Sequence, residues 1–103
     1  VEALLKSKIK MYFTQKIGSY TLQDQRAGRK WDDKEYITTD WIAEQWRALP
    51  TKCCPLCKCP FEKYLDDNNK VKTNITVDRV RNDLPHLKSN SKLMCVRCNV
   101  TKH

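Results

Sequence analysis

Hydrophobic residues recur with a helical period at the start of the chain. They are spaced four positions apart, so that they share one face of a helix, and comprise Leu5, Ile9, Phe13 and Ile17. Gly18 is a common stop signal after such a pattern. We therefore expect a helix over residues 2–17, followed by a segment up to residue 36 that has no clear period.

A second helical pattern precedes the first cysteines. Thr39 is a suitable N-cap, and Asp40 favours the first turn of a helix. The apolar residues that follow share one face, namely Ile42, Trp46 and Leu49. Pro50 cannot continue a helix, so we expect the second helix to end there.

The C-terminal half alternates between apolar and polar residues in short stretches, as strands do. Residues 74–78 and 92–96 are the two alternating runs, and residues 82–86 between them are predicted to form a loop. Asn99 opens a short helix, and residues 66–69 have the composition of a turn. The pattern predicts a small α+β fold, in which two helices precede a hairpin-helix unit.

Two pairs of cysteines have the spacing of metal-binding hooks. Cys54 and Cys57 form one pair and Cys95 and Cys98 the other, and the tight turn within each pair can direct two sulfurs at one ion. Four thiolates make a tetrahedral set that suits structural Zn²⁺ and leaves no open position for water. One shared zinc would close the chain over residues 58–94 and contribute much of the stability of a protein of 103 residues.

Cys53 and Cys59 are surplus to this set and are expected to be free thiols, although either could replace a hook ligand. Six cysteines also allow three disulfides of a secreted module, but such modules spread their cysteines along the chain, whereas these lie in two clusters. No apolar run is long enough to cross a bilayer, and no signal peptide is evident. We expect an intracellular protein in a reducing compartment, the cytoplasm or the nucleus, without a membrane partner.

Positive charge is concentrated in the half that contains the cysteines. The formal net charge is +8, and residues 51–103 carry 11 basic and 5 acidic side chains against 9 and 7 in residues 1–50. A small basic domain attracts polyanions, of which nucleic acid is the usual one. The alternative is a lysine-rich surface that only keeps the protein in solution. Charge alone does not separate DNA from RNA.

Two polar residues lie where they could hold a hard cation near the zinc. Asp78 ends the first predicted strand, and Asn99 directly follows the last cysteine. A carboxylate and an amide oxygen, completed by waters and a phosphate oxygen, form a loose Mg²⁺ site of the kind that serves phosphodiester cleavage. Taken singly, Asp78 is explained as a turn or cap residue and Asn99 as a helix cap. Their combination beside the two hooks favours the metal site.

Three segments together match the pattern of a known family. They are Thr76-Val-Asp-Arg-Val80, Pro85-His-Leu-Lys-Ser-Asn90 and Cys95-Val-Arg-Cys-Asn-Val-Thr-Lys102. Over residues 50–103 the chain thereby resembles the zinc-bound HNH, or ββα-metal, nucleases, and among these the phage recombination endonuclease VII group. The resemblance implies a hairpin and a helix that grip one Mg²⁺ or Mn²⁺ ion, with zinc joining the base of the hairpin to the helix. By position, Asp78 matches the strand-end metal ligand, Asn99 the helix-borne ligand, and Asn90 the central asparagine that steadies the loop or the general base.

The residue after the strand-end acid departs from this family. The family usually has a histidine there as the general base, whereas this chain has Arg79, which cannot accept a proton at neutral pH. Arg79 could instead hold the phosphate. His86 is the replacement candidate for the base, although a residue that follows Pro85 in a loop can also simply cap or pack. His103 shares a helical face with Asn99, but it is the last residue, so fraying is the favoured interpretation.

These observations predict a metal-dependent endonuclease that hydrolyses phosphodiester bonds, with DNA favoured over RNA as the substrate. Residues 1–49 form a helical N-terminal segment in this interpretation, and residues 50–103 form the HNH-like domain. Two alternatives stay open. One is a non-catalytic zinc-stapled module that binds nucleic acid, for which Arg79 is the main argument. The other is a zinc-stapled protein-interaction domain, which the positive charge disfavours.

Overall fold

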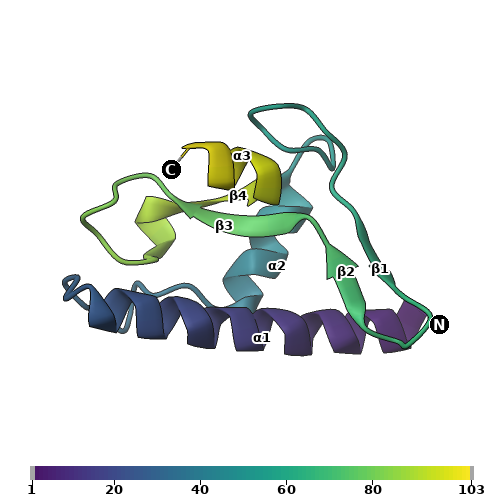
Figure 1. The fold of residues 1–103 in the computed structure, drawn as a ribbon, viewed down its shortest axis with the longest axis horizontal. Helices are drawn as coiled ribbons and strands as arrows, with labels where there is room; N and C mark the ends of the chain where they lie inside the picture. The colour runs from purple at the N-terminus through teal and green to yellow at the C-terminus, as the bar shows by residue number, and fades with distance from the viewer. Residues whose placement is uncertain (1, 103) are drawn as a thin grey trace.

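Helix α1 (Glu2–Arg26) runs along one side of the molecule, and the other elements are stacked against it (Figure 1). The computed structural model describes residues 2–102. The elements after α1 are α2 (Thr39–Ala48), β1 (Lys63–Leu65), β2 (Val71–Thr73), β3 (Ile75–Arg79), the 3₁₀ turn η1 (Lys88–Asn90), β4 (Ser91–Cys95) and α3 (Val96–Lys102). Over residues 2–102 the protein is thus a small α+β fold with three α-helices and two small antiparallel sheets, as predicted.

The first helix is longer than the sequence predicts, because it continues through Gly18 to Arg26. A side chain added at Gly18 would meet no atom within 4 Å, so this position faces open space. Glycine therefore costs only its low helix propensity, about 1 kcal/mol relative to alanine. The following turns offset that cost, since Tyr20 packs against the core and Asp24 is fully buried.

Helix α2 begins beside its predicted start. Thr38, and not Thr39, is the N-cap, and its hydroxyl accepts a hydrogen bond of 3.1 Å from the N–H of Trp41. The prediction was wrong by one residue because both threonines are suitable caps, and only the extended backbone of Thr38 selects between them. Trp41 and Ile42 are buried, which fixes the side of α2 that faces the core.

A hairpin of β1 and β2 precedes the predicted strands and was not itself predicted. It closes on the predicted turn at residues 66–69, where the Asp66 side chain accepts hydrogen bonds from the N–H groups of Asn68 and Lys70. Asn69 has a φ of 59°, a conformation that asparagine tolerates better than most residues. Each strand has only three residues, which is too short for an alternating pattern to stand out.

The second hairpin, β3 with β4, confirms both predicted strands within one residue of their bounds. Its register pairs Ile75 with Cys95 and Asp78 with Lys92. Helix α3 begins directly after β4, three residues before the predicted start at Asn99, and lies on the side of the hairpin away from α1 (Figure 1). The second cysteine hook therefore spans the junction between β4 and α3.

The hydrophobic core joins both helices of the N-terminal segment to the second hairpin. Its buried members are Phe13, Tyr36, Ile37, Trp41, Ile42, Cys54, Phe61, Ile75, Val77, Leu93, Met94 and Cys95. The predicted apolar stripe of α1 is part of it, since Phe13 is buried and Ile9 and Ile17 pack against the cluster. The division into residues 1–49 and 50–103 stays a prediction, and the core takes side chains from both parts.

Candidate functional site

The two cysteine hooks meet and form one cluster of four sulfurs. The Sγ atoms of Cys54, Cys57, Cys95 and Cys98 all lie within 4.8 Å of one another, and those of Cys57 and Cys95 are 3.6 Å apart. A tetrahedral zinc site with Zn–S bonds of about 2.3 Å has sulfurs about 3.8 Å apart. The four thiols therefore have the identity and the spacing of a zinc site, and could hold a zinc ion as predicted.

The backbone around the cluster favours thiolates. N–H groups of Cys95 and Cys98 point at the sulfurs of Cys54 and Cys95, at 3.5 and 3.4 Å. A hydrogen bond from the backbone at Cys59 is the largest cause that lowers the pKa of Cys57, to about 6. Hydrogen bonds with Cys57 and Cys95 raise the pKa of Cys98 to about 12, because crowded sulfurs resist a further negative charge. A divalent cation would remove that conflict.

Cys53 and Cys59 lie outside the cluster. All six cysteines are free thiols, so the alternative of a disulfide framework is not what the structure shows. Cys59 accepts a hydrogen bond of 3.1 Å from Nη2 of Arg97, on α3, while Cys53 forms an isolated β-bridge with Pro60. Both surplus cysteines therefore have contacts of their own and do not belong to the four-sulfur cluster.

Asp78 belongs to β3 and Asn99 to α3, two elements that pack against each other. Side chains alternate along a strand, so Thr76 and Asp78 face away from the core residues Ile75 and Val77. Asn99 of α3 reaches this side, where its Nδ2 donates to Oγ1 of Thr76 at 3.2 Å. Asp78 itself is fully buried. Alternation thus puts Asp78 on the side of β3 that Asn99 reaches, three residues along the strand from Ile75, which pairs with Cys95.

His86 lies on the opposite side of the hairpin, against α1. Its ring stacks on Tyr20 with centroids 4.3 Å apart, and the Tyr20 hydroxyl lies 3.4 Å from the N–H of Val77. Nδ1 of His86 lies 2.8 Å from Oδ2 of Asp24, and since a carboxylate only accepts, we assign a hydrogen to Nδ1. The described contacts of His86 do not bring it to the side that carries Asp78, so its role as the general base stays a prediction.

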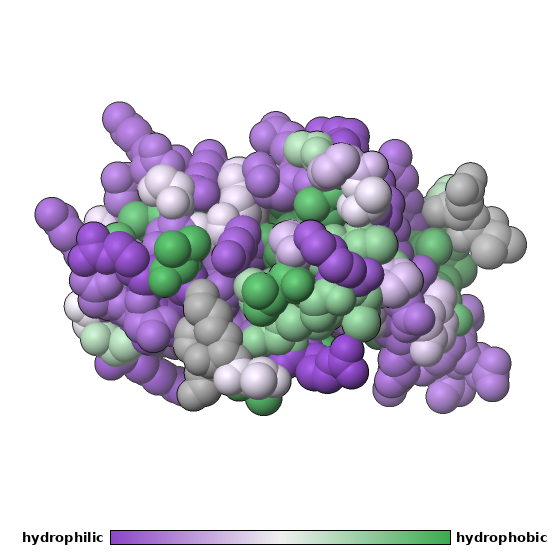
Figure 2. All heavy atoms as spheres, turned by 90° about the horizontal axis from the view of Figure 1, so that it is seen from above, coloured by the Kyte–Doolittle hydropathy of each residue, from purple (hydrophilic) through white to green (hydrophobic). Residues whose placement is uncertain are grey.

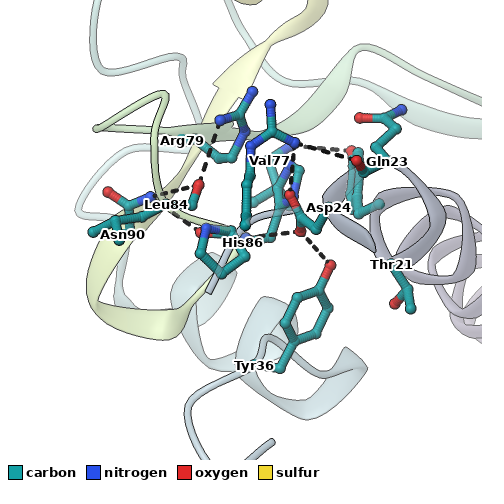
Figure 3. A network of polar contacts seen from close by, with 12 residues as sticks. Thr21, Gln23, Asp24, Tyr36, Val77, Arg79, Leu84, His86 and Asn90 are labelled. Atoms are coloured by element: carbon teal, nitrogen blue, oxygen red, sulfur yellow. Dashed lines mark hydrogen bonds and ion pairs between the residues drawn. The ribbon is translucent and has the colours of Figure 1, made fainter. Parts of the chain in front are cut away.

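Asp24 is the centre of a buried polar network that the sequence did not predict (Figure 3). Oδ2 accepts hydrogen bonds from the hydroxyl of Tyr36 at 2.7 Å and the backbone N–H of His86 at 3.0 Å, and Oδ1 forms an ion pair of 3.0 Å with Arg29. The sequence hints at this network only through the spacing of Tyr20 and Asp24, which are four residues apart. That spacing puts them on one face of a helix only if the helix continues past Gly18. The network ties α1 to the loop between β3 and β4.

Burial and hydrogen bonding act on Asp24 and His86 differently. Burial alone would raise the pKa of Asp24, but the hydrogen bonds from the backbone of His86, from Tyr36 and from the His86 ring bring it below its usual value. Burial is the largest influence on His86 and lowers its pKa. The Asp24 carboxylate opposes that effect, while Arg79 and Arg29 add to it. At neutral pH the pair is therefore a carboxylate and a neutral imidazole.

This pair predicts a loss of stability in mild acid. A histidine whose folded pKa lies below its unfolded value of about 6.5 stabilises the fold fully above that pH, and the contribution is lost as the pH falls toward the folded pKa. We expect the free energy of unfolding to fall below pH 6.5 by at most about 1.4 kcal/mol per pH unit from His86. Urea unfolding at several pH values, with His86→Asn as the variant that keeps a donor for Asp24 but does not titrate, measures this slope. An equal slope in both proteins would contradict the prediction.

Arg79 and Asn90 both hold the loop that follows β3. Nη1 of Arg79 donates to the carbonyls of Asn82 and Leu84, at 2.6 and 3.4 Å. Asn90 is buried; its Nδ2 donates to the carbonyls of Arg81 and Pro85 at 3.1 Å each, and its Oδ1 accepts from the N–H of Arg81. The side chain of Asn90 thus joins the two ends of this loop, and its role at an HNH-like site stays a prediction.

The face that carries α3 is partly apolar. Figure 2 shows hydrophobic side chains gathered near the middle of this face, with hydrophilic residues around them. Leu56, Val96 and Val100 are exposed, and Leu56 shares a shallow hollow with Arg97 and Cys98. The two hooks therefore lie beneath a surface that offers both apolar contact and positive charge.

No protein-family model matches the chain, and no curated protein or solved structure matches it either. Among residues 2–102, none of the helices combines the length and the apolar character needed to cross a membrane. His103, for which the sequence favours fraying over metal binding, lies outside the described residues.

Proposed function

We propose that this protein is a metal-dependent endonuclease that hydrolyses phosphodiester bonds in DNA, built as a zinc-stapled ββα-metal unit of the HNH type. The observation that carries the proposal is the position of Asn99. Helix α3 begins inside the second cysteine hook and brings this side chain to the side of β3 on which Asp78 lies. A zinc ion in the four-sulfur cluster would hold hairpin and helix in that relation.

The chemistry of the two ligands fits a hard cation. Asn99 donates through Nδ2 to Thr76 and Val77, so that its amide oxygen is left as the acceptor, with no described hydrogen bond. A carboxylate and an amide oxygen are ligands that Mg²⁺ and Mn²⁺ accept. Bound there, such an ion neutralises charge on the scissile phosphate and lowers the pKa of a coordinated water.

The protein residues around this site would position the substrate. Arg79 follows Asp78 on β3, so its side chain leaves the other side of the strand, where the carbonyls of Asn82 and Leu84 hold its guanidinium. There it would contact a backbone phosphate of the substrate. It cannot act as a base. Since the described contacts of His86 are on the α1 side, we propose that the cation supplies most of the activation of water, and that His86 holds the loop.

A second candidate is a non-catalytic module that binds DNA. Two observations favour it: arginine stands at the position of the usual base, and His86 is directed toward Asp24 of α1. The basic character of residues 51–103 serves this function as well as it serves a nuclease.

A plasmid-nicking assay of the zinc-loaded protein separates the two candidates. With Mg²⁺ or Mn²⁺ we expect the wild type to nick DNA, and Asp78→Asn to lower the rate by about 100-fold or more, because it removes the charged ligand. Asp83→Asn is the matched control, since Asp83 is exposed and, among residues 2–102, forms an ion pair only with Arg81. A wild type that binds DNA with a steep salt dependence but never nicks it would favour the binding module. In the same assay, a loss of 100-fold or more with His86→Asn would restore His86 as the base.

A further inference from the structure

Two arginines from distant parts of the chain meet at one backbone carbonyl. Nε of Arg29 donates to the carbonyl oxygen of Asn82 at 3.2 Å, and Nη1 of Arg79 donates to the same oxygen at 2.6 Å. Arg29 precedes α2, and Arg79 ends β3 beside Asp78. Two guanidinium groups are thereby held next to each other at the end of the hairpin.

The turn after α1 is built to present Arg29. Gly28 has a φ of +67°, a conformation that glycine adopts without strain, and the N–H of Arg29 donates to the carbonyl of Asp24 at 3.1 Å. This left-handed turn ends the helix and directs the chain back toward the loop that contains Asn82. The position of Arg29 is thus set by the end of the helix and does not depend on a flexible loop.

The hydrogen bonds of Arg29 leave part of its guanidinium available. Its Nε donates to Asn82, and its Nη1 donates to Asp24 and, at 3.4 Å, to the carbonyl of Gln23. The two hydrogens on Nη2 have no acceptor among the described residues, and the side chain is 18% exposed. Burial and the charge of Arg29 lower the pKa of Arg79, whereas the nearby carboxylates of Asp24 and Asp78 raise it. A negatively charged group placed against both guanidinium groups would reduce their mutual repulsion further.

We propose that Arg29 and Arg79 together bind one phosphate group of the nucleic-acid backbone at the end of the β3–β4 hairpin, on the side that faces α1. The inference rests on the proposed function for the identity of the ligand. Guanidinium groups match phosphate oxygens in geometry and keep their charge, which makes a pair of arginines a typical phosphate contact. Asp24 is a positioning residue here, because it fixes Arg29 from the buried side. The N-terminal segment then contributes directly to substrate binding.

The salt dependence of DNA binding tests this inference. Fluorescence anisotropy with a short labelled duplex, the zinc-loaded full chain and no added Mg²⁺ measures the dissociation constant from low to moderate salt. We expect Arg29→Gln to reduce the slope of log K against log salt by about 1, the value for one lost phosphate contact, and to weaken binding at low salt by roughly fivefold. Arg26→Gln makes the same change in charge at an exposed residue of the last turn of α1, and should leave the slope unchanged.

A purely structural role for Arg29 would leave the slope of Arg29→Gln equal to that of the wild type, which would overturn the inference. If the variant does not fold, a nuclear magnetic resonance titration of the wild type tests the inference instead. The ¹⁵N resonances of the Arg29 and Arg79 Nε–H groups should both shift when the duplex is added. An unshifted Arg29 resonance would overturn the inference while leaving the nuclease proposal intact. A wild type that does not bind the duplex at all would instead overturn the proposed function.

Discussion

Removal of zinc is expected to unfold this protein. Structural zinc contributes about 10 kcal/mol or more of apparent binding free energy at neutral pH, which is comparable to the whole stability of an ordinary small domain. Cys54 and Cys95 are members of the hydrophobic core, so the metal ligands and the core residues are partly the same side chains. Without the ion, the cluster would contain four crowded thiols that do not attract one another strongly. The first hook would then no longer be held against β4 and α3.

Cys57→Ser and Cys59→Ser make the matched pair for this prediction. Cys57 belongs to the four-sulfur cluster and Cys59, two residues later, does not. We expect one zinc per chain in the wild type and in Cys59→Ser, and loss of tight zinc binding together with the cooperative unfolding transition in Cys57→Ser. Metal content by mass spectrometry and thermal unfolding by circular dichroism measure both properties. Two ions per chain, or an equal loss in both variants, would show that the cluster is not the zinc site.

Asp24→Ala is expected to destabilise the fold by about 3–5 kcal/mol, the usual cost of removing one partner of a buried ion pair. The carboxylate is fully buried and has the hydroxyl of Tyr36, both N–H groups of His86 and the guanidinium of Arg29 as partners. Alanine would leave these donors without an acceptor in a site that water does not reach. Tyr36→Phe removes one hydrogen bond only, and should cost about 1 kcal/mol.

Urea unfolding of the zinc-loaded protein measures these differences, with Asp67→Ala as the control at an exposed aspartate. A cost for Asp24→Ala near that of Asp67→Ala would mean that Asp24 does not hold α1 to the loop. Nuclear magnetic resonance of the His86 ring adds a second readout, because loss of the carboxylate removes the influence that opposes burial and should lower the pKa of His86 further.

The sequence predicted the structure correctly where short-range spacing alone determines it. The spacing of Cys54, Cys57, Cys95 and Cys98 predicted a cluster that the structure confirms, since each hook is a tight turn and needs little from the rest of the chain. The strands of the second hairpin and the core face of α1 followed from periodicity in the same way. Gly18 misled the prediction because Ile17 before it and Tyr20 after it pack against the core and so keep the helix intact, although Gly18 itself faces open space.

The sequence by itself determined the class of fold, the cysteine cluster and the excess of positive charge, because composition and short-range spacing express these directly. Only the tertiary structure decided on which side of the hairpin each polar residue lies. Alternation along β3 and the start of α3 put Asp78 and Asn99 on one side of the hairpin, while the extended α1 holds His86 on the other side and brings Arg29 to Arg79. These relations join residues 21 or more positions apart, and no local pattern encodes them, because they arise from the packing of one complete element against another.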